Sequence, residues 1–432
     1  MTQSTNGRNN IDKKYFVKGK LRLLSPSIVA SGDNVMADLQ CIRDWEGNLI
    51  LPATSLAGSI RHYLTKSAKD PKKIKHIFGS DDDNSEQSSF SFYDATALSS
   101  DIKTELRDGV KLDNLTKTTE KTGKYDYEVI PANNLFSFRM EVTVRKQESN
   151  IAFIEESLNF IIDQLVKGEI SLGAKSTRGF GKIKLESVAL LALDLTNNEG
   201  INKWVNFAWD GEWEGEKRDF ENEFSNYQVK SNNLWEINFH IVDSLIIKMA
   251  NSDIDGSDSV SLTSQGNPII SGTSWNGAIR HALLNAGREL DCEKKMEDLV
   301  NELFGYVDLN NKTAQRSRIF FSESYIKNGK TSTSHHNKVD RFTGGVVNNA
   351  LFDEEPVYGG DVTLSVEIDS PKEYEIGLLL LALKELHNGI QTVGGNSNIG
   401  RGRLEAKDIK FTQADEKKYF TALQNKLNEE VK

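Results

Sequence analysis

The chain contains one helix-like motif twice, and each copy carries groups that suit contact with a phosphate. Residues 54–64 (TSLAGSIRHYL) and 273–283 (TSWNGAIRHAL) agree at seven of eleven positions and begin 219 residues apart. Each copy has a serine, a glycine three residues later and an arginine three residues after that. The Thr-Ser pair is typical of a helix N-cap, and the N–H groups at a helix start bind anions. The candidate phosphate contacts are Ser55, Gly58 and Arg61 in the first copy and Ser274, Gly277 and Arg280 in the second.

A glycine-rich loop also occurs twice. Residues 173–182 read GAKSTRGFGK and residues 394–403 read GGNSNIGRGR. Such loops can point backbone N–H groups at an anion, but a tight connection between a helix and a strand has the same composition. Neither loop has the Walker or dinucleotide-binding pattern. The candidate polyanion contacts are Lys175, Arg178, Gly179, Gly181 and Lys182 in the first loop and Gly400, Arg401, Gly402 and Arg403 in the second.

The histidines give weaker signals. His62 and His281 follow the motif arginines, but no nucleophile or metal ligand is paired with them in the sequence, so packed or solvent-exposed side chains explain them. His335 and His336 are adjacent, yet no cysteine or second histidine cluster stands near them, which disfavours a zinc site.

The elements that must position these residues follow the same order in both halves. Alternating strands open the copies at residues 15–24 and 234–242, and the motif helices come next. A short strand, a second alternating strand (135–142 and 361–368), an apolar helix (151–167 and 374–388) and a closing strand (182–186 and 403–407) complete each copy. This order predicts an α+β protein with two tandem ferredoxin-like (RRM-like) domains, each a four-stranded antiparallel sheet covered on one face by two helices.

The duplication also predicts the domain bounds. The linker between the two copies carries Trp204, Trp209 and Trp213 among many acidic residues, so we expect it to be ordered and to pack on one domain. The predicted segments are a polar tail (1–12), a first domain (13–195), an acidic linker (196–232), a second domain (233–415) and a helical C-terminal tail (416–432).

Composition limits the possible functions. The 432 residues include 53 Lys and Arg against 63 Asp and Glu, for a net charge of −10, so nucleic acid must be held by local contacts rather than by bulk charge. Two cysteines exclude a disulfide framework and suit a reducing compartment. No apolar stretch is long enough for a membrane span or forms a signal segment, so we expect a soluble, cytoplasmic protein without a membrane partner.

Several of these residues together resemble the repeat-associated mysterious protein (RAMP) superfamily of CRISPR systems, in particular the backbone subunit of type III effector complexes. The resemblance rests on residues 52–61, the Phe78-Gly79 step, the strand at 92–95 and the loop at 176–182. The second copy adds residues 339–345 (VDRFTGG), which are similar to that family's hairpin thumb and include Arg341 as an implied RNA contact, with Glu355, Val357, Gly359 and Gly360 after them. The thumb-type insertions belong to both predicted domains.

The resemblance implies a subunit that binds guide RNA, inserts its thumb into the duplex of guide and target RNA, and cleaves target RNA with an aspartate. The matching residue is Asp38 in the first copy and, by its spacing before the glycine turn, Asp258 in the second; Asp253 and Asp255 remain alternatives. A loop carboxylate can serve as a general base for the ribose 2′-OH or hold Mg²⁺ or another divalent cation near the phosphate. The implied partners are guide RNA, target RNA and other CRISPR effector subunits.

Three departures from the family pattern keep alternatives open. Ala57 and Asn276 stand where the family commonly has a phosphate-binding lysine, and residues 117–123 replace the Val-Asp-Arg run in the first copy. One alternative is therefore an inert structural guide-binding subunit. Another is a guide-processing endoribonuclease, which requires a histidine base, and the only duplicated histidines are His62 and His281.

Overall fold

The computed structural model is a mixed α+β structure whose chain divides into two compact units. It describes residues 11–31, 38–79, 87–112, 119–145, 150–211, 213, 224–228, 233–250, 257–308, 311–408 and 411–429. Unit 1 consists of Met1–Leu106, Tyr127–Ser176 and Gly181–Lys230, and unit 2 consists of Arg107–Asp126, Thr177–Phe180 and Ser231–Lys432. Unit 2 therefore includes two short segments from the first half of the sequence.

Unit 1 is built on an antiparallel sheet with the spatial order β10-β11-β1-β9-β5. Val17 of the central strand β1 pairs with Met140 of β9 on one side and with Leu190 of β11 on the other. The side chains of β9 alternate between buried and partly exposed along the whole strand, as the sequence pattern predicted. The bounds are β1 (Ile11–Leu23), β5 (Phe90–Phe92), β9 (Leu135–Arg145), β10 (Ile170–Ser171) and β11 (Lys182–Asp194).

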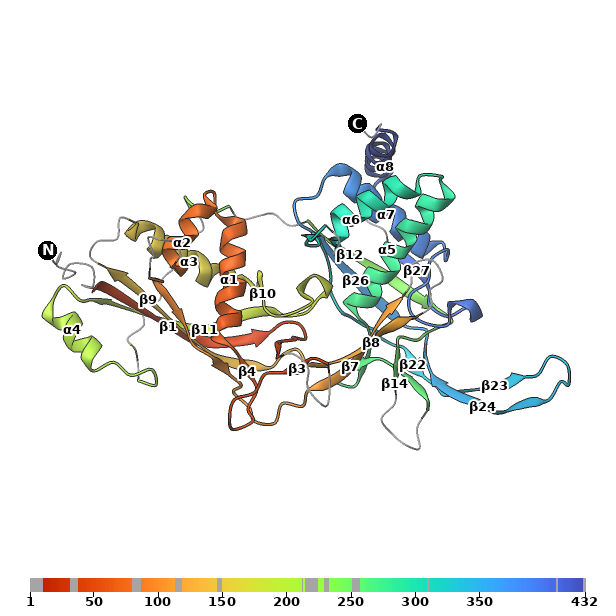
Figure 1. The fold of residues 1–432 in the computed structure, drawn as a ribbon, viewed down its shortest axis with the longest axis horizontal. Coiled ribbons are helices and arrows are strands. Elements are labelled where there is room, and N and C mark those ends of the chain that lie inside the picture. Colours follow the sequence, from red (N-terminus) through yellow and green to blue (C-terminus); the bar gives the residue numbers. More distant parts are fainter. Residues whose placement is uncertain are drawn as a thin grey trace. The chain divides into compact units, whose positions relative to one another are not determined.

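Two helices cover one face of this sheet (Figure 1). Helix α1 (Ala53–Ser67) buries Leu56, Ile60 and Leu64, which recur at the four-residue spacing of one helix face. Helix α3 (Ile151–Lys167) has the predicted bounds and ends at Gly168, whose φ of +79° closes the helix in the left-handed conformation. Both helices share one core with the sheet.

Unit 2 repeats the same arrangement. Its main sheet has the antiparallel order β20-β26-β12-β27. The strands that come at the same places along the first repeat are β5, β9, β1 and β11, and they lie side by side in the same order in the sheet of unit 1. The bounds are β12 (Asn233–Val242), β20 (Ile319–Phe321), β26 (Asp361–Ile368), β27 (Arg403–Asp408), α5 (Gly272–Glu289) and α7 (Glu373–His387).

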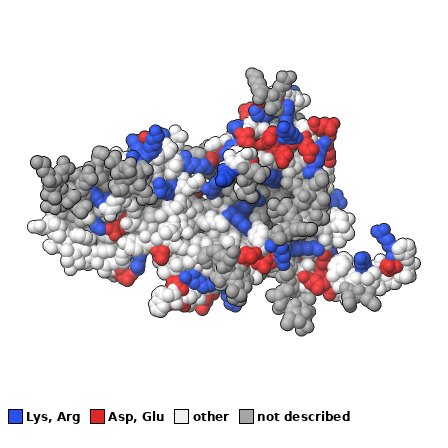
Figure 2. All heavy atoms as spheres, in the orientation of Figure 1, with Lys and Arg blue, Asp and Glu red and all other residues white. Residues whose placement is uncertain are grey.

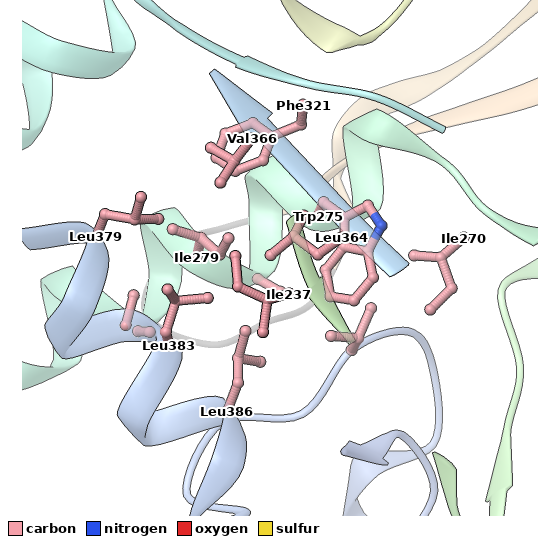
Figure 3. Packing of buried hydrophobic residues seen from close by; sticks show 14 of the residues in the cluster. Ile237, Ile270, Trp275, Ile279, Phe321, Leu364, Val366, Leu379, Leu383 and Leu386 are labelled. Carbon is pink, nitrogen blue, oxygen red and sulfur yellow. The ribbon is translucent and has the colours of Figure 1, made fainter. Parts of the chain in front are cut away.

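The core of unit 2 forms where these helices meet the sheet. In Figure 3, Trp275 and Ile279 of α5 and Leu383 of α7 gather over Ile237 and Leu364 of the sheet. The indole Nε1 of the fully buried Trp275 donates a hydrogen bond to Ser324 at 3.0 Å. The polar end of this large apolar side chain is therefore satisfied inside the core.

The aromatic linker packs on unit 1. Phe207 stacks on Phe16 of β1 at 3.9 Å between ring centroids, and Trp209 meets the edge of the same ring at 5.5 Å. Lys18 lies 4.1 Å from the centroid of Trp213 and donates to the carbonyl of Trp209. Phe16 does not belong to the core beneath the helices, so these linker residues cover the other face of the sheet.

Further along the linker, Tyr227 joins the helix side of unit 1. Its ring stacks on Phe160 at 4.3 Å, and its hydroxyl is 2.5 Å from that of Ser157. The remaining helical segments are η1 (Pro71–Ile74), α2 (Lys75–Phe78), η2 (Ser176–Arg178), α4 (Asn198–Val205), α6 (Glu293–Phe304), η3 (Ser397–Ile399) and α8 (Gln413–Asn428). None of the described helices is long and apolar enough to cross a membrane.

Two long hairpins and several short pairings complete the fold. The hairpins are β7 (Glu105–Leu112) with β8 (Thr119–Val129), and β23 (Ser334–Val339) with β24 (Val346–Glu355). The short strands are β2 (Ala30–Ser31), β3 (Gln40–Cys41), β4 (Ile50–Leu51), β6 (Ala95–Thr96), β13 (Ser244–Leu245), β14 (Lys248–Ala250), β15 (Ser259–Ser261), β16 (Thr263–Ser264), β17 (Asn267–Ile270), β18 (Tyr306–Asp308), β19 (Thr313–Gln315), β21 (Ser324–Tyr325), β22 (Lys330–Thr331) and β25 (Val357–Tyr358).

Candidate nucleic-acid interface

The outer glycines of both glycine-rich loops are required by close backbone packing. A Cβ on Gly181 would lie 1.9 Å from the carbonyl oxygen of Leu172, and one on Gly402 would lie 2.1 Å from that of Val393. Both glycines also have φ near +80°, which favours residues without a Cβ. A tight connection into the following strand therefore accounts for these two positions without a ligand.

The middle glycines of the two loops have different surroundings. A Cβ on Gly179 would lie 2.5 Å from the carbonyl oxygen of Phe321, because residues 177–180 are packed inside unit 2. Gly400 is exposed, and within the described ranges no atom lies within 4 Å of where its Cβ would be. The duplicated loops are alike in sequence, but only Gly400 leaves its backbone open to a ligand.

The predicted loop cations also divide into packed and open positions. The ammonium of Lys175 lies 3.5 Å from the ring centroid of Tyr127, a cation–π contact within unit 1. Lys182 is half-buried at the start of β11, and its backbone N–H donates to Ser25. Arg403 is exposed at the start of β27.

Arg401 lies in a buried polar cluster rather than on the surface. Its guanidinium is 3.5 Å from Glu354, and the two side chains are only 6% and 2% exposed. Glu354 also accepts hydrogen bonds from Lys248 at 2.6 Å and from Asn396 at 2.7 Å. Burial acts to raise the pKa of Glu354, but these hydrogen bonds outweigh it and hold the pKa below its usual value. The cluster ties the end of β24 to the second glycine-rich loop.

The motif helices do not begin where the Thr-Ser pair predicted. Helix α1 begins at Ala53 after Pro52, and α5 begins at Gly272 after Ser271, whose side chain caps the helix by accepting from the Ser274 N–H. Ser55 and Ser274 are therefore first-turn residues, and their prediction as N-caps is wrong. A proline and an earlier serine set the helix starts instead, because both are compatible with extended backbone before a helix.

The duplicated glycines of these helices face open space. Gly58 and Gly277 are exposed, and a Cβ at either position would meet no atom of the described residues within 4 Å. Neither has a positive φ, so no backbone geometry demands glycine there. A glycine in a helix costs about 1 kcal/mol relative to alanine, which leaves close approach by another molecule as a reason for it.

The motif arginines differ between the two copies. Arg61 is exposed and lies 5.9 Å from the ring centroid of Phe78. Arg280 is half-buried and donates to the Asn301 side chain at 2.8 Å. Arg178, from the first glycine-rich loop, donates to the side-chain oxygen of Asn276, one turn before Arg280 on α5. The structure thus brings together two predicted cations from different motifs within unit 2.

The two candidate aspartates occupy matching places. Asp38 comes directly before Leu39, which bridges in parallel to Tyr127 of β8, and Asp258 comes directly before β15, which pairs in parallel with β24. Both aspartates are exposed. Oδ2 of Asp258 accepts the backbone N–H of Asp353 at 2.9 Å. Asp253 and Asp255 lie outside the described residues, so the alternative positions in this loop are not located.

A buried carboxylate that the sequence analysis missed organises the chain after Asp38. Glu128 is 8% exposed and accepts hydrogen bonds from the Cys41 backbone at 2.8 Å, from Arg43 at 2.5 Å and from Thr104 at 2.5 Å. The only sequence signal for it is an acid within an otherwise apolar strand end. Among the described residues, no three His, Cys, Asp or Glu side chains are grouped to hold a metal ion.

The hairpin of β23 and β24 presents aromatic and basic side chains. Phe342 is 98% exposed beside Arg341, which is also exposed. Asp340 shapes the turn by accepting the N–H groups of Thr343 and Phe342, and these hydrogen bonds lower its pKa. His336 stacks on Phe352 at 5.1 Å between ring centroids within the same hairpin.

The histidine positions and surface charges complete the site. His281 shares hydrogen bonds with Gln391 at 3.2 Å and with Asn285 at 2.8 Å through Nδ1, so its ring is held among amide side chains. Basic and acidic side chains are interspersed over the face drawn in Figure 2, rather than one sign of charge covering it.

A family model described as the RAMP superfamily matches residues 20–184 and 243–405. The two matched ranges coincide with the two copies found by self-comparison, so the predicted duplication is confirmed. No curated protein matches the chain.

Proposed function

The chain belongs to the RAMP superfamily of CRISPR-associated RNA-binding proteins, and on that premise we propose that it is a guide-RNA-binding backbone subunit of a type III effector complex. Its partners are then guide RNA, target RNA and other effector subunits in the cytoplasm. Its two domains, 13–195 and 233–415, are ferredoxin-like in this proposal, and the matching strand order of the two sheets supports that architecture.

The observation that carries the proposal is the exposed glycine on both motif helices. Gly58 and Gly277 leave the helix backbone open, and an arginine follows each of them by three residues on the same helix face. A sugar-phosphate strand can approach such a surface closely and be held by the guanidinium. Since the feature occurs in both matched repeats, each repeat has the means to hold one segment of the guide.

We further propose that the chain cleaves target RNA at two positions, with Asp38 and Asp258 as general bases. The carboxylate takes the proton of a ribose 2′-OH, the oxygen attacks the adjacent phosphorus, and the bond from phosphorus to the 5′ oxygen breaks. The 5′ oxygen takes a proton from water, so the products carry a 2′,3′-cyclic phosphate and a 5′-hydroxyl. The exposure of both aspartates and their matching places beside the hairpins support this role.

The same aspartates fit a divalent cation only as single ligands. Mg²⁺ is usually bound by one or two carboxylates together with substrate phosphates, so Asp38 or Asp258 can supply one oxygen while RNA supplies others. When bound, Mg²⁺ or another divalent cation stabilises the charge that develops on the phosphate.

The test is cleavage by the reconstituted complex. End-labelled complementary RNA is incubated with the complex and magnesium, and the products of the wild type are compared with those of Asp38→Ala, Asp258→Ala and the double variant. Loss of a different product with each single change supports two cleavage sites. An unchanged set of products with guide binding intact would make the chain an inert structural subunit.

One observation favours that inert alternative for the second repeat. Because Oδ2 of Asp258 accepts the Asp353 N–H, this carboxylate already anchors the loop beside β24. The single Asp258→Ala variant separates the two roles. A lost product with an unchanged melting temperature favours chemistry, and an unchanged product with a lowered melting temperature favours anchoring.

A further inference from the structure

Two arginines of unit 2 lie together, and the part of the chain that the structure describes offers neither of them a carboxylate partner. Arg178 donates to the side-chain oxygen of Asn276, and Arg280 donates to that of Asn301 at 2.8 Å. Among the residues that the structure describes, no acidic group lies within 4.0 Å of either guanidinium. Both arginines are partly buried, so water screens their charges only in part.

Burial and mutual repulsion both disfavour the charged forms of these two arginines. Burial lowers the pKa of Arg178, and the nearby positive charge of Arg280 lowers it further. Burial also lowers the pKa of Arg280, while the exposed Glu297 acts on it in the opposite direction from beyond ion-pair distance. Holding two guanidiniums together costs free energy unless an anion is shared between them.

The polar group between the arginines cannot supply that anion. Asn276 is 1% exposed, its oxygen accepts from Arg178, and its Nδ2 has no hydrogen-bond partner among the described residues. Guanidinium and amide N–H groups can only donate, so all the remaining polar atoms of these three side chains are donors. A cluster composed of donors with an excess of positive charge is complementary to an oxyanion.

The backbone around the cluster is arranged to hold Arg178 in place. A Cβ on Gly272, the first residue of α5, would lie 2.1 Å from the carbonyl oxygen of Arg178, so only glycine lets the loop rest there. One residue past Asn276, the exposed Gly277 leaves the helix backbone open. The loop arginine is therefore positioned beside the part of α5 that a ligand can approach.

We propose that Arg178, Asn276 and Arg280 form a single binding site for a phosphate group of an RNA strand. This inference rests on the proposed RNA-binding function and adds the site that holds one phosphate of the bound strand. Asn276 stands where the resembled family commonly has a phosphate-binding lysine. The guanidinium of Arg178, from the first glycine-rich loop, places a positive charge beside this position. The corresponding residues of the other motif copies are Ala57 and Ile399, which supply neither an amide side chain nor a guanidinium.

The sharpest test is Asn276→Asp in the full-length chain. The new carboxylate keeps the size of the side chain and can pair with both arginines, so the melting temperature should rise. The same change fills the site with negative charge, so the affinity for a single-stranded RNA oligonucleotide should fall by roughly tenfold. A rise in melting temperature with unchanged RNA affinity would overturn the proposal, because that result is expected of a purely structural cluster.

Arg178→Ala and Arg280→Ala provide an independent measure. Each should weaken RNA binding by roughly tenfold and reduce the slope of log affinity against log salt by about 0.7, the value for one lost phosphate contact on a single strand. The matched control is Arg288→Ala, which removes the same charge from the same helix but pairs with Glu293 at 3.3 Å. Equal slopes for all three variants would contradict the site.

Inorganic phosphate distinguishes the source of the anion. If phosphate raises the melting temperature of the wild type but not of Asn276→Asp, while both bind RNA equally, the site holds free phosphate and the RNA assignment is wrong. Failure of the proposed function has a different signature, since the wild type would then bind no RNA either alone or in the reconstituted complex.

Discussion

Arg107 of β7 donates a hydrogen bond to Glu323 at 2.5 Å, and the two side chains are 1% and 6% exposed although 216 residues separate them in the chain. Both residues belong to unit 2, so a strand from the first half of the sequence contributes a buried charge to that unit. The pair shows that unit 2 is completed by the hairpin of β7 and β8.

Breaking this buried pair should destabilise unit 2. Glu323→Gln leaves the Arg107 guanidinium buried without a full counter-charge, at a cost of about 3 kcal/mol in the free energy of unfolding. Chemical denaturation followed by circular dichroism measures this loss. The control is Glu199→Gln, which breaks an exposed pair with Lys203 and should leave the free energy of unfolding nearly unchanged. Equal effects of the two variants would refute the prediction.

Removing the carboxylate that organises the segment after Asp38 should affect one cleavage site selectively. Glu128→Gln weakens the hydrogen bonds to Cys41, Arg43 and Thr104, so the backbone after Asp38 loses its fixed position. In the reconstituted complex, we expect the product assigned to Asp38 to decrease at least tenfold and the product assigned to Asp258 to persist. Faster hydrogen exchange at Cys41 should accompany the loss, and equal decreases of both products would count against it.

The aromatic linker should contribute measurably to the stability of unit 1. Trp209→Ala removes contacts with Phe16 and Phe207 and uncovers the sheet, at a cost of about 2 kcal/mol. Trp45→Ala is the matched control, because Trp45 is 91% exposed and its loss should be nearly neutral. Urea denaturation of both variants tests the difference, and similar midpoints would mean that the linker adds no stability.

Glu385 should make unit 2 less stable as the pH rises. Burial, helped by the negative charge of Glu289, raises the pKa of Glu385 to about 7. The folded state therefore favours the protonated acid, and stability that is present below about pH 4.5 is lost as the pH rises through 7. Glu385→Gln should stabilise the protein at pH 8 on the order of 1 kcal/mol and have little effect at pH 5. A gain that does not depend on pH would contradict this assignment.

The exposed helix glycine predicts opposite effects on stability and binding. The Cβ that Gly277→Ala adds would meet no described atom within 4 Å. The change should therefore stabilise α5 by about 0.5 to 1 kcal/mol, because alanine has the higher helix propensity. If RNA approaches this backbone, the added methyl group should lower RNA affinity by several-fold. Thermal unfolding and RNA titration of the same variant provide the two readings. Higher stability with unchanged affinity would show that RNA does not pass over Gly277.

Patterns within one segment predicted the fold well. The alternation in β9 and β26 and the apolar helix α3 appear with the expected positions, because burial on one face leaves a regular mark on the sequence. The start of α1 was wrong, since a Thr-Ser pair resembles a cap wherever it stands and Pro52 sets the actual boundary. Local composition cannot decide between two neighbouring residues that both tolerate a helix start.

The candidate site was predictable only as separate motifs. The sequence indicated Arg178 and Arg280, but their association depends on residues 177–180 belonging to unit 2, which no local pattern records. The same limit applies to Arg401, whose burial against Glu354 depends on where β24 ends relative to the second loop. Tertiary packing therefore determines which of the predicted cationic side chains are exposed to solvent.

The segments from the first half of the sequence that belong to unit 2 limit how the chain can be divided. Since residues 107–126 and 177–180 are part of unit 2, a gene divided within the linker would encode a second product that lacks pieces of its own fold. The two repeats match one another in sequence, but the second half alone does not contain every residue of unit 2. Residues 231–432 expressed alone should therefore be less soluble than the same residues produced together with the first half.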